Sequence, residues 1–362
     1  MGIAGCRWYL PINGSTNSNA AGQANRSSWD HRNSKRAESI IAEWMPVKKY
    51  EIAVLDDYQN VALESADWSV LRDRADITVF EDHISELEPL ARRLVPFDVL
   101  CIMRERTPMT AELLDRLPNL KLIASTGAGN AAIDAEAVKR RGIEVLHTGY
   151  NSNPTIEFTW ALILALVRNV ATESASLRGG GWQTAVGADL FGKTLGVVGL
   201  GNIGSRVAEI GRAFGMNVIA WSQNLTKERA DAEGARLVSK EEIFRESDII
   251  TIHLVLSHRS RGIVGRSELT SMKPTAYLIN AARGPIVDEA ALIEILKAGK
   301  IAGAALDVFD VEPLPAEHPF RHLPNVLATP HLGYGSRSLY ATFYQDSVAN
   351  IKSWIYRTTD SS

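Results

Sequence analysis

The sequence predicts an α/β protein made of two doubly wound domains, each built on a parallel sheet. Short apolar runs alternate with longer amphipathic stretches from Val47 onward, a pattern typical of parallel strands covered by helices. Two blocks show this alternation, one on each side of an apolar helix that follows Pro154. A chain of 362 residues is long enough for two such domains.

The composition is that of a globular protein, with 45% hydrophobic and 22% charged residues. A formal net charge of -3 gives no electrostatic reason to bind nucleic acid or an acidic membrane. The longest apolar run, residues 158–167, is too short to span a bilayer. Cys6 and Cys101 form no redox or metal-ligand pattern, so we expect a cytoplasmic protein without a bound metal.

The first 46 residues differ from the rest. Residues 13–34 are rich in Ser, Asn, Gly and Arg and lack apolar periodicity, so they cannot bury enough surface to offset chain entropy. We therefore expect residues 1–46 to form a disordered N-terminal extension. A transit peptide is a weaker interpretation, because the stretch carries Asp30, Glu38 and Glu43.

In the first alternating block, several apolar runs are followed directly by polar residues. Runs at 51–55, 99–103 and 121–125 are the predicted strands, and ligands bind beyond the carboxyl ends of such strands. Arg104 or Arg106, after the second run, can attract an anionic substrate; an ion pair with Glu105 or a neighbouring acid is the alternative. The helix expected from Thr155 to about Ser176 is apolar on most faces, which predicts burial against another domain or subunit.

A glycine fingerprint opens the second block. Gly199, Gly201 and Gly204 stand between the predicted strand 194–198 and a predicted helix, 205–214, with a further strand at 218–221. The first glycine permits a tight turn, the second lets the backbone approach a pyrophosphate, and the third lets the helix pack on the strand. The pattern predicts a dinucleotide site in a Rossmann domain; a purely structural turn is the alternative.

The residues after that second strand bear on cofactor choice. A carboxylate there would hold the ribose of NAD and repel the extra phosphate of NADP. The tip instead contains Ser222, Gln223 and Asn224, with Lys227 and Arg229 a few residues on. Either NAD or NADP is therefore compatible, with a slight preference for NADP; no discrimination at all is the alternative.

Three polar segments end the second block, each after an apolar run. They contain Arg283, Glu312 and His331. A histidine can exchange a proton with a carbonyl oxygen near neutral pH, and a carboxylate on its other nitrogen favours the charged ring. An arginine matches a substrate carboxylate. Taken singly, Arg283 could be a surface or phosphate ligand, Glu312 a loop carboxylate and His331 a cap.

Taken together, the motifs resemble the D-isomer-specific 2-hydroxyacid dehydrogenase family, which includes phosphoglycerate dehydrogenases and glyoxylate and hydroxypyruvate reductases. The resemblance implies that Arg283 binds the substrate carboxylate and carbonyl, that His331 is the acid/base and that Glu312 is its partner. It covers about Val47 to Trp354 and rests on four motifs: Gly199-Leu200-Gly201-Asn202-Ile203-Gly204; Asn280-Ala281-Ala282-Arg283-Gly284; Asp307-Val308-Phe309 with Glu312-Pro313; and Thr329-Pro330-His331-Leu332-Gly333.

The same resemblance implies further ligands. The backbone at Ala128 and Gly129 is expected to hold the substrate carboxylate, and Asp307 to lie near the nicotinamide carboxamide. The residues expected to bind the cofactor are Thr155, Gly199, Gly201, Asn202, Ile203, Gly204, Ser222, Gln223, Asn224, His253 and Asp307.

The family fold implies a flavodoxin-like substrate domain of residues 47–150 and 331–358, and an NAD(P)-binding Rossmann domain of residues 151–330. It also implies a homodimer joined through the cofactor domain. The expected reaction is hydride transfer between NAD(P)(H) and a small 2-oxo or D-2-hydroxy acid, such as glyoxylate or hydroxypyruvate. The alternative is an NADH-sensing, co-repressor-like binding protein. Formate oxidation is disfavoured, because the formate-oxidising enzymes that resemble this fold pair the histidine with a glutamine, whereas this chain has Glu312.

Overall fold

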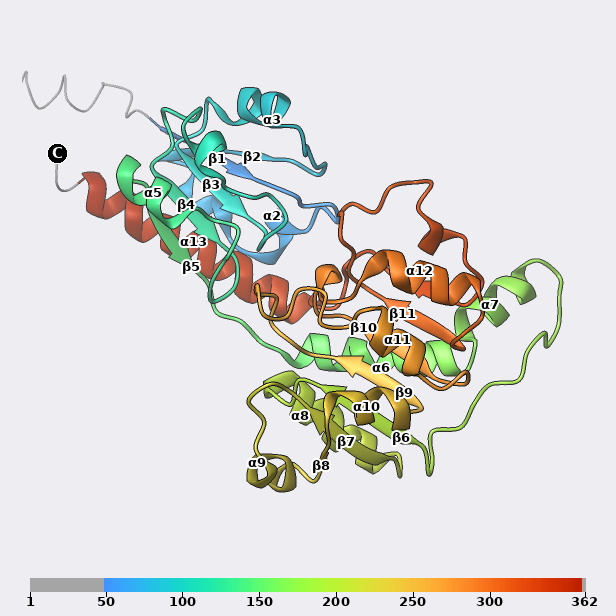
Figure 1. Cartoon of the computed structure of the whole chain (residues 1–362). Helices are drawn as coiled ribbons and strands as arrows, with labels where there is room; N and C mark the ends of the chain where they lie inside the picture. The colour runs from blue at the N-terminus through green and yellow to red at the C-terminus, as the bar shows by residue number, and fades with distance from the viewer. Residues whose placement is uncertain (1–48, 360–362) are drawn as a thin grey trace, which may run out of the picture. The chain divides into compact units, whose positions relative to one another are not determined.

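The structure is a computed structural model that describes residues 49–359. The N-terminal extension expected at residues 1–46 lies outside the described residues. The described part contains two parallel sheets, one of five and one of seven strands, each with helices packed on it (Figure 1). The predicted fold class is therefore confirmed.

The five-stranded sheet comes first along the chain. Its strand order is β2-β1-β3-β4-β5 and all its pairings are parallel. This is the doubly wound order in which the winding reverses between β1 and β3. Its elements are β1 (Tyr50–Val54), α2 (Ala62–Ser65), the 3-10 turn η1 (Trp68–Leu71), β2 (Ala75–Val79), α3 (Leu87–Leu94), β3 (Val99–Ile102), α4 (Ala111–Leu114), β4 (Leu122–Ser125), α5 (Ala135–Arg141) and β5 (Glu144–His147).

Both faces of this sheet are covered, which is why β3 and β4 consist wholly of buried residues. On one face, Leu94 of α3 and Leu113 of α4 pack with strand residues such as Leu100. On the other face lies α13 (Arg337–Thr359), the last helix of the chain, which contributes Phe343 and Tyr344 to the core. The C-terminal helix thus completes the first sheet.

The helix that follows Pro154 is broken, which corrects the expectation of one helix from Thr155 to Ser176. The structure has α6 (Asn153–Val167) and α7 (Val170–Arg178), bent by 61°. Asn169, at the break, has a left-handed φ of 55°, a conformation that interrupts the helix. Only α6 is buried: it packs on the seven-stranded sheet, whereas no residue of α7 is buried.

The seven-stranded sheet follows α7. Its order is β12-β11-β10-β9-β6-β7-β8, and all its pairings are parallel. The winding therefore reverses between β6 and β9, as in dinucleotide-binding domains. Its elements are β6 (Thr194–Val198), α8 (Asn202–Ala213), β7 (Asn217–Trp221), α9 (Lys227–Ala232), β8 (Arg236–Leu237), α10 (Lys240–Glu246), β9 (Ile249–Ile252), α11 (Arg266–Ser271), β10 (Tyr277–Asn280), η2 (Gly284–Ile286), α12 (Glu289–Lys297), β11 (Gly303–Leu306), η3 (Pro319–Arg321) and β12 (Val326–Ala328).

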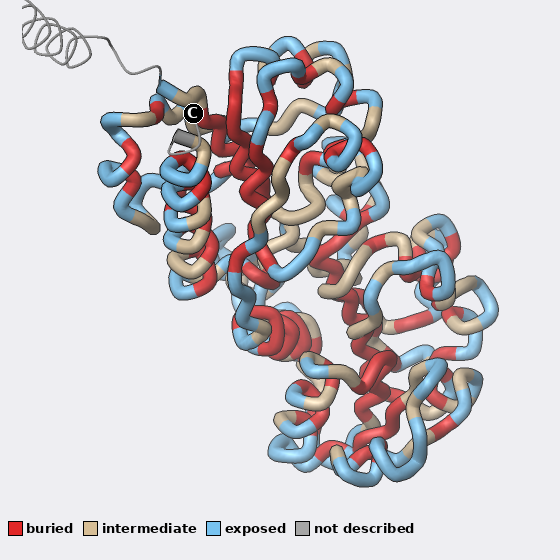
Figure 2. The backbone as a smooth tube through the Cα atoms, turned by 90° about the vertical axis from the view of Figure 1, so that its left-hand side faces the viewer, coloured by how far each residue is buried: buried red, intermediate tan, exposed pale blue. Residues whose placement is uncertain are grey.

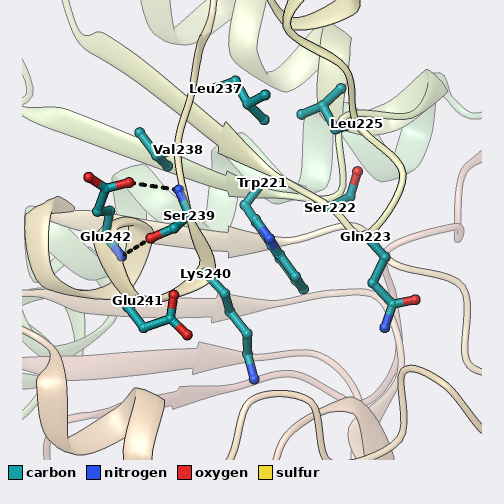
Figure 3. Close-up of a pocket in the computed structure, with 10 residues that line it drawn as sticks. All are labelled: Trp221, Ser222, Gln223, Leu225, Leu237, Val238, Ser239, Lys240, Glu241 and Glu242. Carbon is teal, nitrogen blue, oxygen red and sulfur yellow. Dashed lines mark hydrogen bonds between the residues drawn. The ribbon is translucent and has the colours of Figure 1, made fainter.

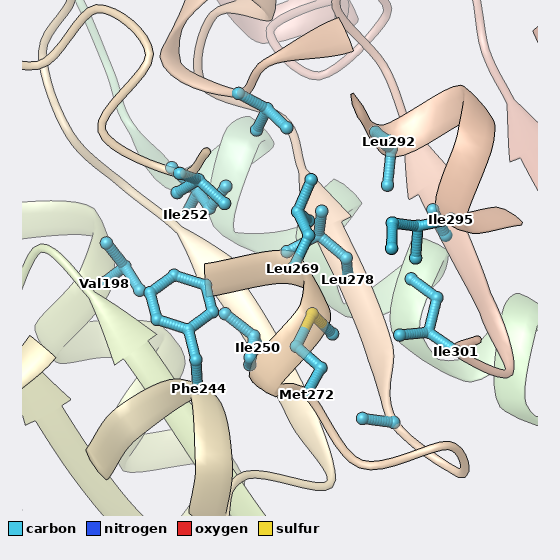
Figure 4. Packing of buried hydrophobic residues seen from close by; sticks show 14 of the residues in the cluster. Val198, Phe244, Ile250, Ile252, Leu269, Met272, Leu278, Leu292, Ile295 and Ile301 are labelled. Atoms are coloured by element: carbon cyan, nitrogen blue, oxygen red, sulfur yellow. The ribbon is translucent and has the colours of Figure 1, made fainter. Parts of the chain in front are cut away.

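Apolar side chains fill both faces of this second sheet. One face packs α10, α11 and α12 through residues such as Phe244, Leu269 and Leu292 (Figure 4). The other face packs α6 and α8. Figure 2 shows these buried segments running through the interior with exposed loops around them. The rigid strands therefore fix the positions of the loops at their carboxyl ends, where the candidate site lies.

Among residues 49–359, no single helix is both long and apolar enough to cross a membrane. The bent pair of α6 and α7 passes that test together, by length and composition only.

Candidate active site

The glycine loop after β6 has the geometry of a phosphate cradle. Gly199 has a φ of 103°, and a Cβ there would lie 2.7 Å from the carbonyl oxygen of His253. A Cβ on Gly204 would lie 2.0 Å from the carbonyl oxygen of Gly199, so the third glycine lets α8 pack against the loop. A Cβ on Gly201 would have no atom within 4 Å. The turn and the packing need the first and third glycines, and the second faces open space.

Helix α8 begins at Asn202, three residues earlier than predicted, so Asn202 and Ile203 are its first residues. Gly201 is its N-cap and has no side chain to accept from the first amides. The unpaired N–H groups and the positive end of the helix dipole are therefore available to an anion. The residues present fit a dinucleotide pyrophosphate.

A hollow of about 590 Å³ lies at the carboxyl ends of β7 and β8 (Figure 3). Ser222 and Gln223, two of the residues expected to bind the cofactor, line it, whereas Asn224 is exposed and is not part of the lining. The remaining lining residues are Trp221, Leu225, Leu237, Val238, Ser239, Lys240, Glu241 and Glu242.

The basic residue at this hollow is not one of those singled out from the sequence. Lys227 pairs with Asp231, one turn along α9, at 2.5 Å, and neither Lys227 nor Arg229 lines the hollow. Lys240 does, and it forms an ion pair with Glu268 at 2.9 Å. Lys227 or Arg229 was the expected phosphate contact because both are close to β7 in the sequence. The neighbouring strand β8 instead brings Lys240 to the same edge of the sheet.

His331 and Glu312 meet in a close ion pair. The His331 Nδ1 atom lies 2.5 Å from Glu312 Oε2, and the other carboxylate oxygen, Oε1, accepts from the amide of Phe309 at 2.9 Å. Burial acts to raise the pKa of Glu312, but His331, the Phe309 amide and the charge of Arg283 outweigh it, so this pKa lies below its usual value. Glu312 is therefore a carboxylate at neutral pH, and no hydrogen bond from within residues 49–359 engages the Nε2 atom of His331.

Asp307 holds the loop that carries His331. Its Oδ1 accepts from the Thr329 hydroxyl at 2.6 Å and from the Leu332 amide at 2.8 Å, and its Oδ2 accepts from the Gly333 amide at 2.7 Å. The side chain is fully buried, which raises its pKa despite these donors. His331 itself has a left-handed φ of 53°, a conformation that needs such anchoring in a non-glycine residue.

Arg283 is already paired in this structure. Its Nη1 donates to the carbonyl of Ala282 at 2.7 Å, and its Nη2 lies 2.9 Å from Glu105 Oε2. Arg283 follows β10, whereas Glu105 follows β3 of the other sheet. The structure therefore joins the two sheets' strand ends through a residue predicted to bind substrate.

Arg104 forms the ion pair that was the alternative to a substrate contact. Its Nε lies 3.4 Å from Glu105 Oε2, and its Nη2 lies 3.5 Å from Oε1. The guanidinium also lies over the Tyr150 ring, 5.3 Å from its centroid, and close to Gly127. Ala128 and Gly129 beside it are exposed, and within residues 49–359 nothing accepts from their amides.

Thr155 and His253 were both expected to bind the cofactor, and each lies close to a neighbouring hydroxyl group. Thr155 is buried at the start of α6, its hydroxyl 3.4 Å from that of Tyr150. The Nε2 atom of His253 lies 2.9 Å from the Thr251 hydroxyl, and burial lowers the pKa of His253 to about 4. His253 is therefore neutral at pH 7 beneath the glycine loop.

One polar cluster, centred on Asp56, was not predicted as a unit, although Arg106 in it was a candidate for attracting the substrate. Asp56 accepts from the Thr107 hydroxyl at 2.7 Å and lies 2.8 Å from His83 Nδ1, and its carbonyl accepts from Arg106 at 3.1 Å. The Arg106 guanidinium lies over the rings of Tyr58 and Tyr334, the latter edge-on to His331. The sequence carries two local signals, Asp56 and Asp57 after the run 51–55 and Arg106 after the run 99–103, but nothing local links Asp56 to His83.

The sequence of residues 160–333 matches the family model for the NAD binding domain of D-isomer specific 2-hydroxyacid dehydrogenases. The chain is 45% identical over 236 residues to a glyoxylate reductase of Aeropyrum pernix, covering 62% of this chain and 70% of that protein. It is 41% identical over 250 residues to a D-3-phosphoglycerate dehydrogenase of Methanocaldococcus jannaschii, covering 68% of this chain but only about half, 47%, of that protein. A crystal structure of a phosphoglycerate oxidoreductase from Vibrio cholerae O395 is similar, with a TM-score of 0.81 and 38% identity over 85% of this chain and 99% of that one.

Proposed function

Since the chain belongs to the D-isomer specific 2-hydroxyacid dehydrogenase family, we propose that it is an NAD(P)-dependent oxidoreductase acting on a small 2-oxo or D-2-hydroxy acid. The observation that carries the proposal is the pair of His331 and Glu312, 2.5 Å apart and near enough to Arg283 for its charge to lower the pKa of Glu312. A proton donor, its carboxylate partner and a carboxylate-binding cation are the groups this reaction needs.

In the reducing direction, each of these residues has one task. Arg283 binds the substrate carboxylate and polarises the carbonyl oxygen at C2. A nicotinamide held at the carboxyl edge of the seven-stranded sheet would supply the hydride. The Nε2–H of His331 gives its proton to the carbonyl oxygen, which becomes the hydroxyl, and Glu312 stabilises the protonated ring beforehand from Nδ1. In the oxidising direction the neutral Nε2 takes the proton back.

The loop after β4 completes the substrate site. The amides of Ala128 and Gly129 point to no acceptor among the described residues and can donate to the substrate carboxylate. Arg104 adds positive charge beside them, although Glu105 offsets part of it. Substrates with one carboxylate next to a carbonyl, such as glyoxylate or hydroxypyruvate, fit this set of donors.

The cofactor is held along the carboxyl edge of the seven-stranded sheet. The glycine loop and the first amides of α8 take the pyrophosphate, and Thr155, His253 and Asp307 are proposed toward the nicotinamide end. Ser222 and Gln223 face the adenosine, Asn224 lies beside them outside the hollow, and the tip has no carboxylate to repel a 2′-phosphate. Lys240 lines the same hollow, but so do Glu241 and Glu242, so acceptance of NADPH as well as NADH is proposed from the neutral tip alone.

The alternative, an NADH-sensing protein without turnover, is not favoured. The relatives above are named as a reductase and a dehydrogenase. The chain also keeps the arginine, the glutamate and the histidine that turnover requires.

A cytoplasmic location is part of the proposal, because Cys101 is buried and unpaired, in line with a reducing compartment.

The proposal includes a homodimer joined through the cofactor domain. Helix α7 and the segment after it reach away from the seven-stranded sheet (Figure 1), and none of the residues of α7 is buried. Large apolar side chains are exposed along this arm: Val170, Leu177, Trp182, Val186 and Phe191, with exposed fractions of 54%, 58%, 76%, 98% and 81%. An apolar surface of that extent is typical of a protein interface.

Light scattering after gel filtration tests the dimer. The wild type should have twice the mass of the chain, and the double variant Trp182→Glu with Val186→Glu should be a monomer. Leu63→Glu, an exposed apolar residue of the first sheet's domain, is the matched control and should remain a dimer. A monomeric wild type would contradict this part of the proposal.

A steady-state assay tests the activity itself. Purified protein is mixed with NADH or NADPH and a panel of 2-oxo acids: glyoxylate, hydroxypyruvate, phenylpyruvate and phosphohydroxypyruvate. We expect turnover with at least one of them and a product of D configuration. Cofactor binding without turnover on the whole panel would favour the binding-protein alternative.

A further inference from the structure

The guanidinium of Arg283 already holds a carboxylate. Its Nη2 lies 2.9 Å from Glu105 Oε2, and its Nη1 donates to the Ala282 carbonyl. The side chains of Glu105 and Arg283 are 29% and 31% exposed, so a small molecule can reach the pair. A substrate carboxylate must therefore compete with Glu105 for Arg283.

Glu105 is held in place from its own domain. Arg104 has a left-handed φ of 49°, and its amide donates to the Thr126 hydroxyl at 3.0 Å while its carbonyl accepts from Asn130 at 2.5 Å. These bonds fix the turn that directs Glu105 toward Arg283. The guanidinium of Arg104 lies 3.4 to 3.5 Å from the same carboxylate.

Glu105 therefore lies between two cations. Burial acts to raise its pKa, but the charges of Arg283 and Arg104 outweigh burial, so this pKa lies below its usual value and the side chain is ionised at neutral pH. If Glu105 leaves Arg283, Arg104 still compensates its charge. When Glu105 is displaced from Arg283, its carboxylate therefore still has a cation beside it.

We propose that Glu105 is a displaceable internal carboxylate that occupies Arg283 until the substrate carboxylate replaces it, with Arg104 retaining Glu105 afterwards. This inference rests on the proposed function, because it takes Arg283 as the substrate ligand. Glu105 is a residue that sets substrate affinity and does not take part in proton or hydride transfer.

The geometry favours the exchange. Glu105 contacts Arg283 through one oxygen and one nitrogen. A substrate carboxylate that approaches the guanidinium along its plane can form two parallel bonds, which are stronger than one. The exchange thus favours ligands that present a flat, two-oxygen group to Arg283, and it keeps the cation compensated when no substrate is bound.

Binding of oxamate, an unreactive 2-oxo acid analogue, tests the proposal. Titration calorimetry with the NADH-loaded protein compares the wild type with Glu105→Gln. Removing the internal competitor should lower the Kd of oxamate by about two- to fivefold, the usual worth of a partly exposed ion pair. The KM of the best 2-oxo acid should fall by the same factor, with kcat within about twofold.

Glu112→Gln is the matched control, because it removes a carboxylate that pairs with Arg116 at 3.0 Å on the surface of the same domain. It should leave both constants unchanged. If Glu105→Gln does not fold, Glu105→Asp serves instead: it keeps the charge but shortens the reach to Arg283, so it should also tighten oxamate binding.

An unchanged or higher Kd in the Glu105 variants would overturn the proposal and make Glu105 a group that orients Arg283 for substrate. Failure of the proposed function looks different: the wild type itself would neither bind oxamate nor turn over any 2-oxo acid. That result would remove the premise of this proposal as well.

Discussion

The carboxyl edges of the two sheets contribute to the site in different ways. On the seven-stranded sheet, backbone geometry and buried bonds hold the functional groups: Gly199 needs its positive φ, and Asp307 anchors the His331 loop through three donors. On the five-stranded sheet, the groups are charged side chains paired with one another, such as Arg104 with Glu105. We infer that the edge of the seven-stranded sheet holds the reacting groups in place. The edge of the five-stranded sheet sets substrate affinity, through ion pairs that a substrate can replace.

The largest effect is expected on the seven-stranded edge. His331→Ala should lower kcat by about two to four orders of magnitude, the usual worth of a positioned general acid. Cofactor affinity, followed by NADPH fluorescence, should stay within about threefold, because His331 serves the proton and not the pyrophosphate. A loss of less than tenfold in kcat would assign the proton to another group.

A smaller loss is expected when the anchor of that loop is changed. Asp307→Asn replaces one acceptor oxygen with a donor amide that faces another donor, so the free energy of unfolding should fall by about 1–3 kcal/mol. Because His331 then loses its fixed position, kcat should fall about tenfold or more. Asp310→Asn, an exposed carboxylate three residues away, is the control and should change neither. Equal behaviour of the two variants would show that the loop does not depend on Asp307.

The smallest effect is expected at the hollow lined by Ser222, where the adenosine end of the cofactor is proposed to bind. The wild type should accept NADPH at least as well as NADH, with a preference of about tenfold or less, about 1.4 kcal/mol. Ser222→Asp should shift the ratio of kcat/KM values toward NADH, because the new charge repels a 2′-phosphate and accepts from the ribose. Asn224→Asp, outside the lining, should shift the ratio less. A strong NADH preference in the wild type, or no shift in Ser222→Asp, would place the ribose elsewhere.

The same contrast explains how much could be predicted from the sequence. The glycine loop and β6 follow from local pattern, and β6 has the predicted bounds, Thr194–Val198. The sequence also predicted that Glu312 and His331 would act together, because motifs in a fixed order carry that information. The structure adds the 2.5 Å contact that joins them.

What could not be predicted depends on long-range pairing. The bond between Glu105 and Arg283 joins residues 178 positions apart, and nothing near either one signals the other. Lys240 reaches the hollow beside Ser222 only because β8 pairs with β7. The break at Asn169 was missed because apolar composition continues through it and only its φ of 55° reveals the bend. Side-chain partners that tertiary packing creates thus escape a local analysis.

The pH dependence of kcat/KM in wild type and Glu312→Gln tests the central claim, that Glu312 stabilises the proton-donating form of His331. The pKa of Glu312 lies below its usual value, so this residue is negative throughout the working range and favours the protonated ring. Reduction of a 2-oxo acid needs that proton, so activity should fall as pH rises. Without the charge, the fall should occur at lower pH, because the charge-assisted hydrogen bond that favours the protonated ring is lost. An identical pH profile in the two proteins would contradict the account.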